Sequence, residues 1–235
     1  MSGLAVVTGG ARGIGAAVAE RLAADGLAPL LVDLDPAVEQ TAAELGGGAS
    51  AVVADITEPA GRDAVRAAVG DAPLRALVNN AGITRDARIG KMDEAAFRAV
   101  IRVNLGGAYE LTRALQDTFA DGGAIVNMSS RAYLANIGQF NYSASKGGLV
   151  GLTRALALEF APRVRVNALA PGLTASEMTK AMPEKVLDKL VASIPAGRMA
   201  EPEEIAETVA MLVSPTTWYV TGQVLVACGG RSLVP

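Results

Sequence analysis

Short apolar runs typical of β-strands alternate with helical patterns from one end of this chain to the other. Such alternation predicts a doubly wound α/β fold, in which helices cover both faces of a parallel sheet. Most of the runs are apolar without interruption, as expected for strands that are buried on both faces. We expect strands at residues 4–8, 30–33, 51–54, 74–79, 124–128, 164–169 and 224–227.

No linker, low-complexity stretch or internal repeat separates these patterns, so residues 1–235 are predicted to form a single domain. Asn104, Gly106 and Gly107 lie in the middle of the longest helical pattern, where we expect a kink. The helices are expected at residues 14–25, 36–45, 58–69, 93–119, 142–161 and 202–212.

Residues 149–161 are apolar almost all the way round the predicted helix. A helix of this kind is buried on every side. One face can cover the sheet, so we expect the other to meet a second copy of the chain in a homo-oligomer. A helix covered by a loop of its own chain is the alternative.

Composition excludes several classes of function. The chain has no histidine, which excludes imidazole-dependent hydrolases and His-ligated zinc enzymes, and we expect no metal site. A net charge of −3, with four Phe, four Tyr and one Trp, argues against nucleic acid as a partner. Without a long apolar run or a signal-peptide pattern, we expect a soluble, cytoplasmic protein with no membrane contact. The single cysteine, Cys228, is expected to be packed rather than catalytic.

A glycine-rich turn, Thr8-Gly9-Gly10-Ala11-Arg12-Gly13-Ile14-Gly15, follows the first strand and leads into the first helix. Glycines let a pyrophosphate approach the backbone, and the free N–H groups of a helix N-terminus attract its charge. Asp33 ends the second strand and Asp55 follows the third, where carboxylates can bond to the ribose and the adenine of a nucleotide. Each aspartate alone could equally be a turn or capping residue. In series with the glycine turn they predict a nucleotide site.

Tyr142 and Lys146 are four residues apart, which places them on the same face of a helix. A nearby cation favours the ionised form of a phenol, whose unperturbed pKa is about 10. With its pKa lowered, Tyr142 could exchange a proton with a substrate oxygen. The alternative is an ordinary Tyr/Lys pair on a solvated helix face.

Several further motifs occur in a specific order. Together with the glycine turn, Asn79-Asn80-Ala81-Gly82, Asn104, Ser130, Tyr142-x3-Lys146 and Pro171-Gly172 closely resemble the short-chain dehydrogenase/reductase family over residues 4–230. The resemblance implies a Rossmann fold with seven parallel strands, a nicotinamide cofactor, and a homotetramer or dimer. Ile83-Thr84-Arg85-Asp86 and Gly138-Gln139 are similar to the 3-oxoacyl-ACP reductase branch.

The resemblance also implies roles for individual residues. Tyr142 would be the general acid/base, and Ser130 would polarise the substrate carbonyl. Lys146 would lower the pKa of Tyr142 and bind the nicotinamide ribose, while Asn104 would keep a water in the proton relay. Residues 171–176 would hold the nicotinamide carboxamide, with Ser176 where the family usually has threonine. The expected cofactor contacts are Gly9, Arg12, Gly13, Ile14, Gly15, Asp33, Asp55, Ile56, Asn80, Ala81, Gly82, Tyr142, Lys146, Pro171, Gly172, Thr174 and Ser176.

Two adjacent serines compete for the catalytic role. Ser129 lies 13 residues before Tyr142, which is the usual spacing in the family, and Ser130 lies 12 before it. We expect Ser130 to be active, because Asn127-Met128-Ser129-Ser130 matches the family's strand end with the second serine active. The loop that follows would then carry a deletion.

Arg12 and Asp33 favour different cofactors. A carboxylate at the end of the second strand repels a 2′-phosphate, whereas an arginine in the glycine turn could pair with it. Because Asp35 adds further negative charge, we predict NAD(H) over NADP(H), with NADP(H) as the alternative.

The predicted reaction is hydride transfer between the cofactor and a carbonyl or secondary alcohol, with a 3-oxoacyl thioester as the favoured substrate. Residues 116–121, Gln-Asp-Thr-Phe-Ala-Asp, would attract an acidic carrier protein poorly, which leaves acyl-CoA or small ketones and alcohols open. Secondary-alcohol, polyol or steroid dehydrogenases are alternatives, and a non-catalytic nucleotide-sensing scaffold is an alternative of another class.

Residues 173–200 are expected to form a substrate lid. Its apolar wall would consist of Met178, Met182, Val186, Leu187, Leu190, Val191 and Ile194, although helix packing on the core could account for some of them. Arg131, next to the predicted catalytic serine, could meet a substrate carboxylate or phosphate, or could be a solvated surface residue.

Overall fold

The computed structural model describes residues 3–176, 179 and 182–234. Within these residues, seven parallel strands form one sheet in the order β3-β2-β1-β4-β5-β6-β7. This confirms the predicted doubly wound α/β class. The strands are β1 (Leu4–Thr8), β2 (Ala28–Asp33), β3 (Ser50–Val53), β4 (Leu74–Asn79), β5 (Phe119–Met128), β6 (Val164–Pro171) and β7 (Val224–Ala227).

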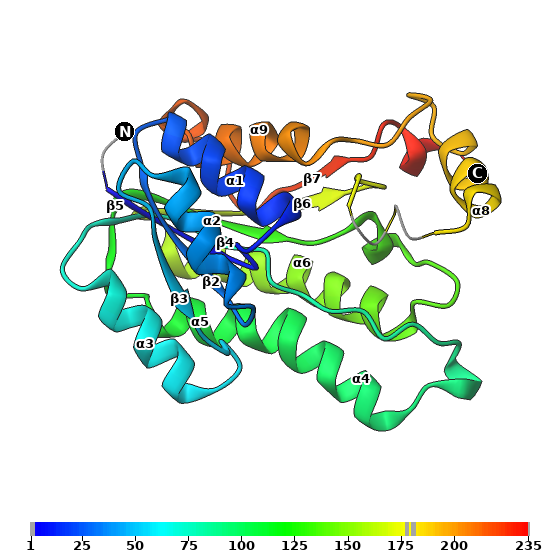
Figure 1. The fold of residues 1–235 in the computed structure, drawn as a ribbon, viewed down its shortest axis with the longest axis horizontal. Coiled ribbons are helices and arrows are strands. Elements are labelled where there is room, and N and C mark those ends of the chain that lie inside the picture. The colour runs from blue at the N-terminus through cyan, green and yellow to red at the C-terminus, as the bar shows by residue number, and fades with distance from the viewer. Residues whose placement is uncertain (1–2, 177–178, 180–181, 235) are drawn as a thin grey trace.

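Helices cover both faces of the sheet (Figure 1). One face carries α1 (Gly13–Ala24), α2 (Ala37–Leu45) and α9 (Pro202–Val213). The other carries α3 (Pro59–Val69), α4 (Glu94–Ile101), α5 (Ala108–Ala114) and α6 (Phe140–Phe160). A further helix, α8 (Glu184–Ala192), lies near the C-terminus at one end of the molecule.

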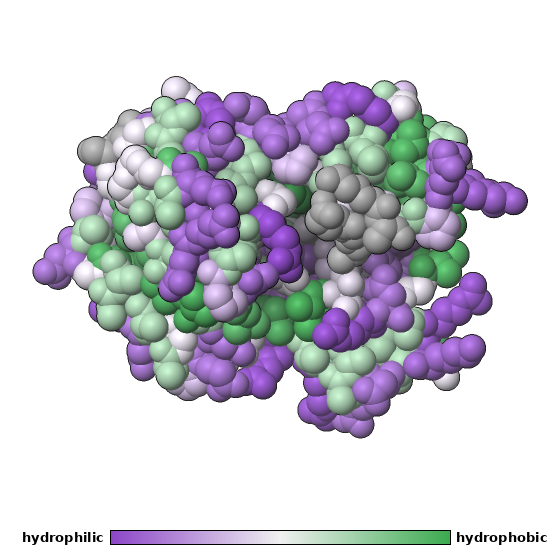
Figure 2. Space-filling view, viewed as in Figure 1, coloured by the Kyte–Doolittle hydropathy of each residue, from purple (hydrophilic) through white to green (hydrophobic). Residues whose placement is uncertain are grey.

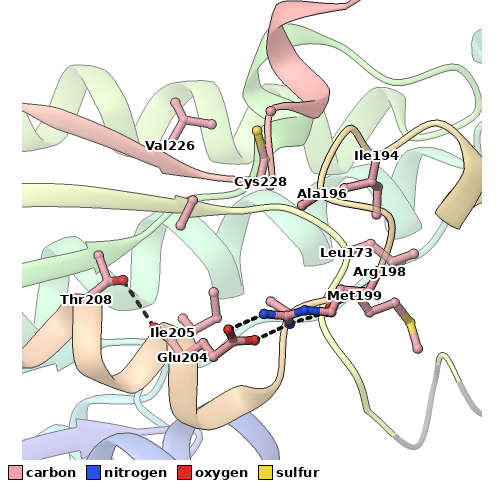
Figure 3. Close-up of a pocket in the computed structure, with 14 residues that line it drawn as sticks. Leu173, Ile194, Ala196, Arg198, Met199, Glu204, Ile205, Thr208, Val226 and Cys228 are labelled. Carbon is pink, nitrogen blue, oxygen red and sulfur yellow. Dashed lines mark hydrogen bonds and ion pairs between the residues drawn. The ribbon is translucent and has the colours of Figure 1, made fainter.

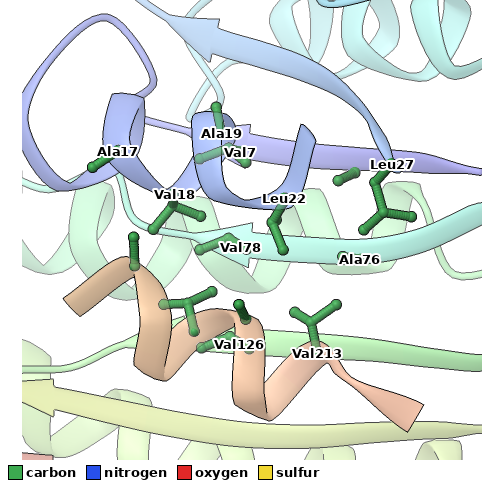
Figure 4. Packing of buried hydrophobic residues seen from close by; sticks show 14 of the residues in the cluster. Val7, Ala17, Val18, Ala19, Leu22, Leu27, Ala76, Val78, Val126 and Val213 are labelled. Atoms are coloured by element: carbon green, nitrogen blue, oxygen red, sulfur yellow. The ribbon is translucent and has the colours of Figure 1, made fainter. Parts of the chain in front are cut away.

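Consecutive strand residues point to opposite faces, which explains why the strands are apolar without interruption. In β1, Val7 packs in a buried cluster with α1 and α9, part of which Figure 4 shows around Val18 and Val213. Its neighbour Val6 packs in the cluster on the opposite face, with residues of α3 and α5 such as Leu111. Both faces of each central strand must therefore be apolar.

The helix predicted at residues 93–119 is confirmed in its start and in its interrupted middle, and it is wrong at its C-terminal end. The chain forms α4, then a π-helix at Arg102–Gly107, then α5, which ends at Ala114, and β5 begins at Phe119. The π-helix occupies the position of the predicted kink, and it brings Gly107 close enough to Ile56 that a Cβ there would lie 3.1 Å from Ile56 Cδ1. Phe119 starts the strand because its buried ring packs edge-on against Phe160, with the ring centroids 5.8 Å apart.

The predicted burial of α6 on every side holds for only part of its surface within one chain. Leu149 and Val150 are buried, whereas Leu158 is 84% exposed. Leu158 on the outer side of α6 is therefore left largely uncovered by the described part of its own chain, and the homo-oligomer stays a prediction. None of the helices among the described residues combines the length and apolar character needed to span a bilayer.

Candidate functional site

A cavity of about 570 Å³ opens beside the carboxyl ends of β4, β5 and β6. It collects many of the residues predicted from the sequence, because parallel strands end at the same edge of a sheet. Those that line it are Arg12, Ile14, Asn80, Gly82, Ser130, Tyr142, Lys146, Pro171, Gly172, Thr174 and Ser176. The predicted residues outside its lining are Gly9, Gly13, Gly15, Asp33, Asp55, Ile56, Ala81 and Asn104.

The glycine turn forms an open cradle at the N-terminus of α1. Gly9 has a φ of 66°, and a Cβ there would lie 2.8 Å from Asn80 Nδ2, so neither the conformation nor the space suits a side chain. Gly13, with a φ of 57°, has no atom within 4 Å of a hypothetical Cβ, which leaves room above the helix end. The first N–H groups of a helix have no partner within it, and Arg12 at the N-cap supplies no side-chain cap. This cradle fits the phosphates of a nucleotide cofactor.

Thr8 and Asn80 hold the glycine turn against the end of β4. The Thr8 hydroxyl oxygen accepts hydrogen bonds from the backbone N–H groups of Asn80 and Ala81, each at 3.0 Å. Asn80 Nδ2 in turn donates to the carbonyl oxygens of Thr8 at 3.0 Å and Gly9 at 3.2 Å. Asn80 therefore positions the cradle as well as lining the cavity, a role that the sequence motif did not reveal.

Asp33 also supports the turn. Its Oδ2 accepts from the N–H of Ala11 at 3.0 Å, and its Oδ1 accepts from the N–H of Asp35 at 3.1 Å. Arg12 Nη1 pairs with Asp35 Oδ2 at 2.7 Å, so the arginine expected to attract a 2′-phosphate and the aspartate expected to add negative charge beside Asp33 neutralise each other. A hydrogen bond from the N–H of Ala37, together with Arg12, holds the pKa of Asp35 below its ordinary value.

Asp55 and Ile56 lie apart from the cavity. Asp55 Oδ1 accepts from the N–H of Thr57 at 2.8 Å and from its hydroxyl at 2.7 Å, which is the turn role considered as the alternative. The side chain of Ile56 is buried in the apolar cluster beneath the sheet. Its backbone alone remains for a cofactor contact.

Tyr142 and Lys146 share one face of α6, as the spacing predicted. Lys146 Nζ lies 5.5 Å from the centroid of the Tyr142 ring and donates to the carbonyl oxygen of Met128 at 2.7 Å. Burial lowers the pKa of Lys146 to about 8. The ammonium is thus held between the end of β5 and the phenol ring.

The expectation that Lys146 lowers the pKa of Tyr142 is wrong for this arrangement. Burial raises the pKa of Tyr142, a hydrogen bond with the Ser130 side chain lowers it, and the charge of Asp86 raises it, with a net rise. The lysine charge faces the ring and is bonded to Met128, so loss of solvent around the phenol dominates. At neutral pH the phenol keeps its proton.

The two serines have different partners. The buried hydroxyl of Ser129 donates to the main-chain oxygen of Lys146 at 2.9 Å. The Ser130 side chain instead hydrogen-bonds Tyr142 and accepts from the N–H of Ala132 at 3.2 Å. The loop after Ser130 contains Ala135 with a φ of 84°, a conformation that costs a residue other than glycine about 1–3 kcal/mol.

Asn104 lies in the π-helix and braces the loop after Gly82. Its Oδ1 accepts from the N–H of Ile83 at 2.8 Å, and its Nδ2 donates to the Ile83 carbonyl at 3.0 Å and to Ser145 Oγ at 3.1 Å. A Cβ at Gly82 would lie 3.2 Å from Asn104 Oδ1 and 3.5 Å from Lys146 Nζ, so glycine permits this approach. The role of Asn104 in holding a water stays a prediction.

The segment after β6 carries an unsatisfied polar atom. Thr174 lines the cavity, is 9% exposed, and has a buried Oγ1 without a hydrogen-bond partner in the described part of the chain. Ser176 Oγ accepts from the N–H of Thr179 at 3.2 Å. A buried hydroxyl without a partner is unfavourable, so Thr174 fits a polar group of a bound ligand. The contact of residues 171–176 with the nicotinamide carboxamide stays a prediction.

The predicted lid wall contributes three side chains to the cavity, those of Met182, Leu190 and Ile194. Val186 is 47% exposed and, like Leu187 and Val191, lies outside the lining. Met178 lies outside the described residues. Apolar side chains show as green patches at the end of the molecule that carries α8 and the C-terminus (Figure 2).

A second cavity, of about 320 Å³, was not predicted (Figure 3). Leu173 and Ile194 line both cavities, and Cys228 is buried beside this one. Arg198 and Glu204 form a two-bond ion pair at its wall, at 2.6 and 2.7 Å. These charges satisfy each other, so the cavity offers a ligand little beyond apolar surface.

Comparison with known proteins agrees with this geometry. A family model described as enoyl-(acyl carrier protein) reductase matches residues 9–232. The (3R)-3-hydroxyacyl-CoA dehydrogenase of Mus musculus is 41% identical over 97% of this chain and 96% of its own length. The 3-oxoacyl-(acyl-carrier-protein) reductase FabG of Vibrio cholerae is 37% identical over 98% of each chain.

The fold also matches a solved structure of a short-chain dehydrogenase/reductase, a glucose/ribitol dehydrogenase of Brucella melitensis. It superposes with a TM-score of 0.92 at 32% identity, over 97% of this chain and 96% of that one. Together with the family model, which spans nearly the whole chain, these similarities establish that the protein belongs to the short-chain dehydrogenase/reductase family of oxidoreductases.

Proposed function

We propose that this enzyme transfers a hydride between a nicotinamide cofactor and the 3-oxo or 3-hydroxy group of an acyl thioester. The observation that carries the proposal is that Ser130, Tyr142 and Lys146 line one wall of the cavity that the glycine turn also borders. The relatives named above act, by their names, on 3-hydroxyacyl-CoA and on 3-oxoacyl groups of a carrier protein.

The family uses nicotinamide cofactors, and the chain has groups that fit one. Backbone N–H groups at the start of α1 would bind the pyrophosphate, and Asp33 would accept bonds from the adenosine ribose. The free hydroxyl of Thr174, with Ser176, would bond the carboxamide. When bound, the cofactor supplies or accepts the hydride.

Tyr142 acts as the acid in the reducing direction. Its raised pKa keeps the phenol protonated at neutral pH, so the proton is available for the substrate oxygen as that oxygen gains negative charge. Ser130 donates a hydrogen bond to the same oxygen. Lys146, still largely protonated at pH 7 with its pKa of about 8, would instead bind the nicotinamide ribose, because its charge does not lower the pKa of Tyr142 here.

We infer a preference for NAD(H). The pairing of Arg12 with Asp35 supports it, because the arginine that could attract a 2′-phosphate is already neutralised. Two charges 4 Å apart repel by about 1 kcal/mol in water and about 4 kcal/mol at an effective dielectric constant of 20. Asp33 would exert such a repulsion on a 2′-phosphate.

A CoA thioester is a better candidate than a carrier-protein thioester. The segment between α5 and β5 carries Asp117, and Asp121 follows at the start of the strand. An acidic carrier protein would be repelled there. We further propose a cytoplasmic homo-oligomer, a dimer or tetramer, in which the exposed apolar face of α6 is covered by a second subunit, and a substrate lid formed by residues 173–200.

The test is a panel of acetoacetyl-CoA, longer 3-oxoacyl-CoA thioesters, simple ketones, polyols and steroid alcohols, assayed with both cofactors in both directions. We expect the highest kcat/KM for 3-oxoacyl-CoA reduction with NADH. A higher kcat/KM on secondary alcohols, polyols or steroids would favour those dehydrogenase alternatives. Cofactor binding without turnover of any carbonyl or alcohol would favour a nucleotide-sensing scaffold.

A further inference from the structure

The charged side chains that line the main cavity all carry positive charge. They are Arg12, Arg131, Lys146 and Arg231, and no aspartate or glutamate lines it within the described residues. A concave surface with charges of one sign concentrates ions of the opposite sign. The cavity therefore favours anionic ligands beyond what a single lysine would achieve.

Three of these four cations have partners within the chain. Arg12 pairs with Asp35 at 2.7 Å, and Lys146 Nζ donates to the Met128 carbonyl at 2.7 Å. Arg231 Nη1 donates to the carbonyl of Val234 at 3.2 Å. Arg12 is therefore neutralised by the chain itself, whereas Lys146 and Arg231 keep their charge and have carbonyl oxygens as hydrogen-bond partners.

Arg131 differs from the other three. It is half-buried, and neither a hydrogen-bond acceptor nor a carboxylate partner is found for its guanidinium in the part of the chain that the structure describes. A guanidinium has five N–H donors and binds carboxylates and phosphates through two parallel hydrogen bonds. A half-buried cation without a partner, lining a cavity of positive charge, suits an anionic group brought by a ligand.

The position of Arg131 indicates which ligand brings that group. Arg131 directly follows Ser130, whose side chain hydrogen-bonds Tyr142, and it begins the short helix Arg131–Leu134. It is therefore next to the proposed site of proton transfer. The glycine turn that fits the cofactor pyrophosphate is on a different segment, at the start of α1.

We propose that Arg131 determines specificity by binding an anionic group of the substrate, close to the carbonyl that reacts. This inference rests on the proposed function, because it assigns the anion to the substrate of that site. The anion is either a carboxylate on the acyl portion or a phosphate on the thioester carrier. Both are oxyanions that a guanidinium binds in the same way.

The direct test measures binding and does not depend on turnover. Wild-type enzyme and Arg131→Met, each saturated with NADH to block the cofactor site, are titrated calorimetrically with two matched pairs. The pairs are 4′-phosphopantetheine against pantetheine, and glutarate against glutaramide. Arg131→Lys tests whether the charge alone suffices, and Arg88→Met, an exposed arginine outside the cavity lining, is the matched control.

We expect Arg131→Met to weaken binding of one charged probe by about 10- to 100-fold, as for the loss of a charged hydrogen-bond partner, without changing its neutral match. A loss with phosphopantetheine identifies the carrier phosphate, and a loss with glutarate identifies an acyl carboxylate. Arg88→Met should bind all four probes as the wild type does. Unchanged affinity for both charged probes in Arg131→Met, or equal losses for charged and neutral probes, would overturn the inference.

Kinetics separate this inference from the proposed function. For thioesters that carry the preferred anion, Arg131→Met should raise KM and leave kcat close to wild type, whereas KM for neutral N-acetylcysteamine thioesters should not change. A wild type that turns over no thioester refutes the proposed function while the titrations still decide the role of Arg131. If the wild type and Arg131→Met both turn over thioesters with the same ratio of KM for anionic thioesters to KM for neutral ones, that result refutes the role of Arg131 and leaves the proposed function intact.

Discussion

The hydroxyl of Ser129 donates a hydrogen bond to the main-chain oxygen of Lys146 at 2.9 Å. This bond connects the end of β5 to α6. The ammonium of Lys146 also donates to the carbonyl oxygen of Met128, the residue before Ser129. Lys146 is thereby held at both its backbone and its side chain. The neighbouring Ser130 is left to bond the phenol of Tyr142.

The two serines should respond differently to removal of the hydroxyl. Ser130→Ala should lower kcat/KM by about 10²- to 10³-fold, as when a hydrogen-bond donor to a developing oxyanion is lost. Ser129→Ala should keep turnover within a few-fold of wild type and lower the free energy of unfolding by about 1 kcal/mol, the value of one buried hydrogen bond. Steady-state kinetics and urea denaturation measure both effects. The assignment fails if Ser129→Ala loses turnover and Ser130→Ala keeps it.

Burial of Lys146 should make stability depend on pH. Its pKa is lowered from 10.5 to about 8, which corresponds to about 3 kcal/mol. Below pH 8 both states carry the proton, and burial of the charge destabilises the folded state. Between about pH 8 and pH 10.5 only the unfolded chain keeps the proton on Lys146, so this contribution to stability rises with pH.

Urea denaturation at pH 7 and pH 10 measures this contribution. Relative to Lys146→Met, the wild type should gain up to about 3 kcal/mol of unfolding free energy over this range. Lys185→Met, which removes an exposed lysine of α8, should follow the wild type at both values. Parallel curves for wild type and Lys146→Met would show that the lysine titrates normally.

Asp35 should influence cofactor choice through Arg12. Wild-type enzyme should bind NADH more tightly than NADPH in a fluorescence titration. Asp35→Asn keeps an oxygen for the N–H of Ala37 but frees Arg12 and removes a negative charge, so NADPH affinity should rise by roughly tenfold while NADH affinity stays the same. Tighter binding of NADPH by the wild type would contradict the preference for NAD(H).

The exposed face of α6 should mediate self-association. Leu158 is 84% exposed in the single chain, so Leu158→Lys should leave the fold of each subunit intact and reduce the mass measured by sedimentation equilibrium. Ile89→Lys, at a residue that is 71% exposed but distant in sequence from α6, is the control and should keep the wild-type mass. A wild type that sediments as a monomer would refute the proposed interface.

Sequence predicts the sheet well because its physical signal is strong. Val6 and Val7 must both be apolar since helices cover both faces, and such runs stand out between glycine turns and helical patterns. The prediction fails at residues 93–119, where helical periodicity continues through a π-helix and does not reveal that α5 ends at Ala114. The sequence prediction also misses α8, because its apolar residues were assigned to a lid wall. None of the residues of α8 is buried.

The candidate site is predictable in its members but not in their electrostatics. Spacing alone brings Tyr142 and Lys146 to one helix face. The direction of the Tyr142 pKa, however, depends on burial and on where Nζ points, and both are set by β5 and the loop after it. The choice between Ser129 and Ser130 likewise depends on which hydroxyl the backbone of α6 engages.

The most direct test of the proposed chemistry is Tyr142→Phe, assayed for both turnover and cofactor affinity. The substitution removes the phenolic proton and keeps the ring that lies beside Lys146. We expect 3-oxoacyl-CoA reduction to fall by about 10²- to 10⁴-fold, the range for loss of a general acid, while NADH binds with wild-type affinity. Turnover retained within a few-fold of wild type in Tyr142→Phe, with normal cofactor binding, would contradict the proton-transfer role on which the account depends.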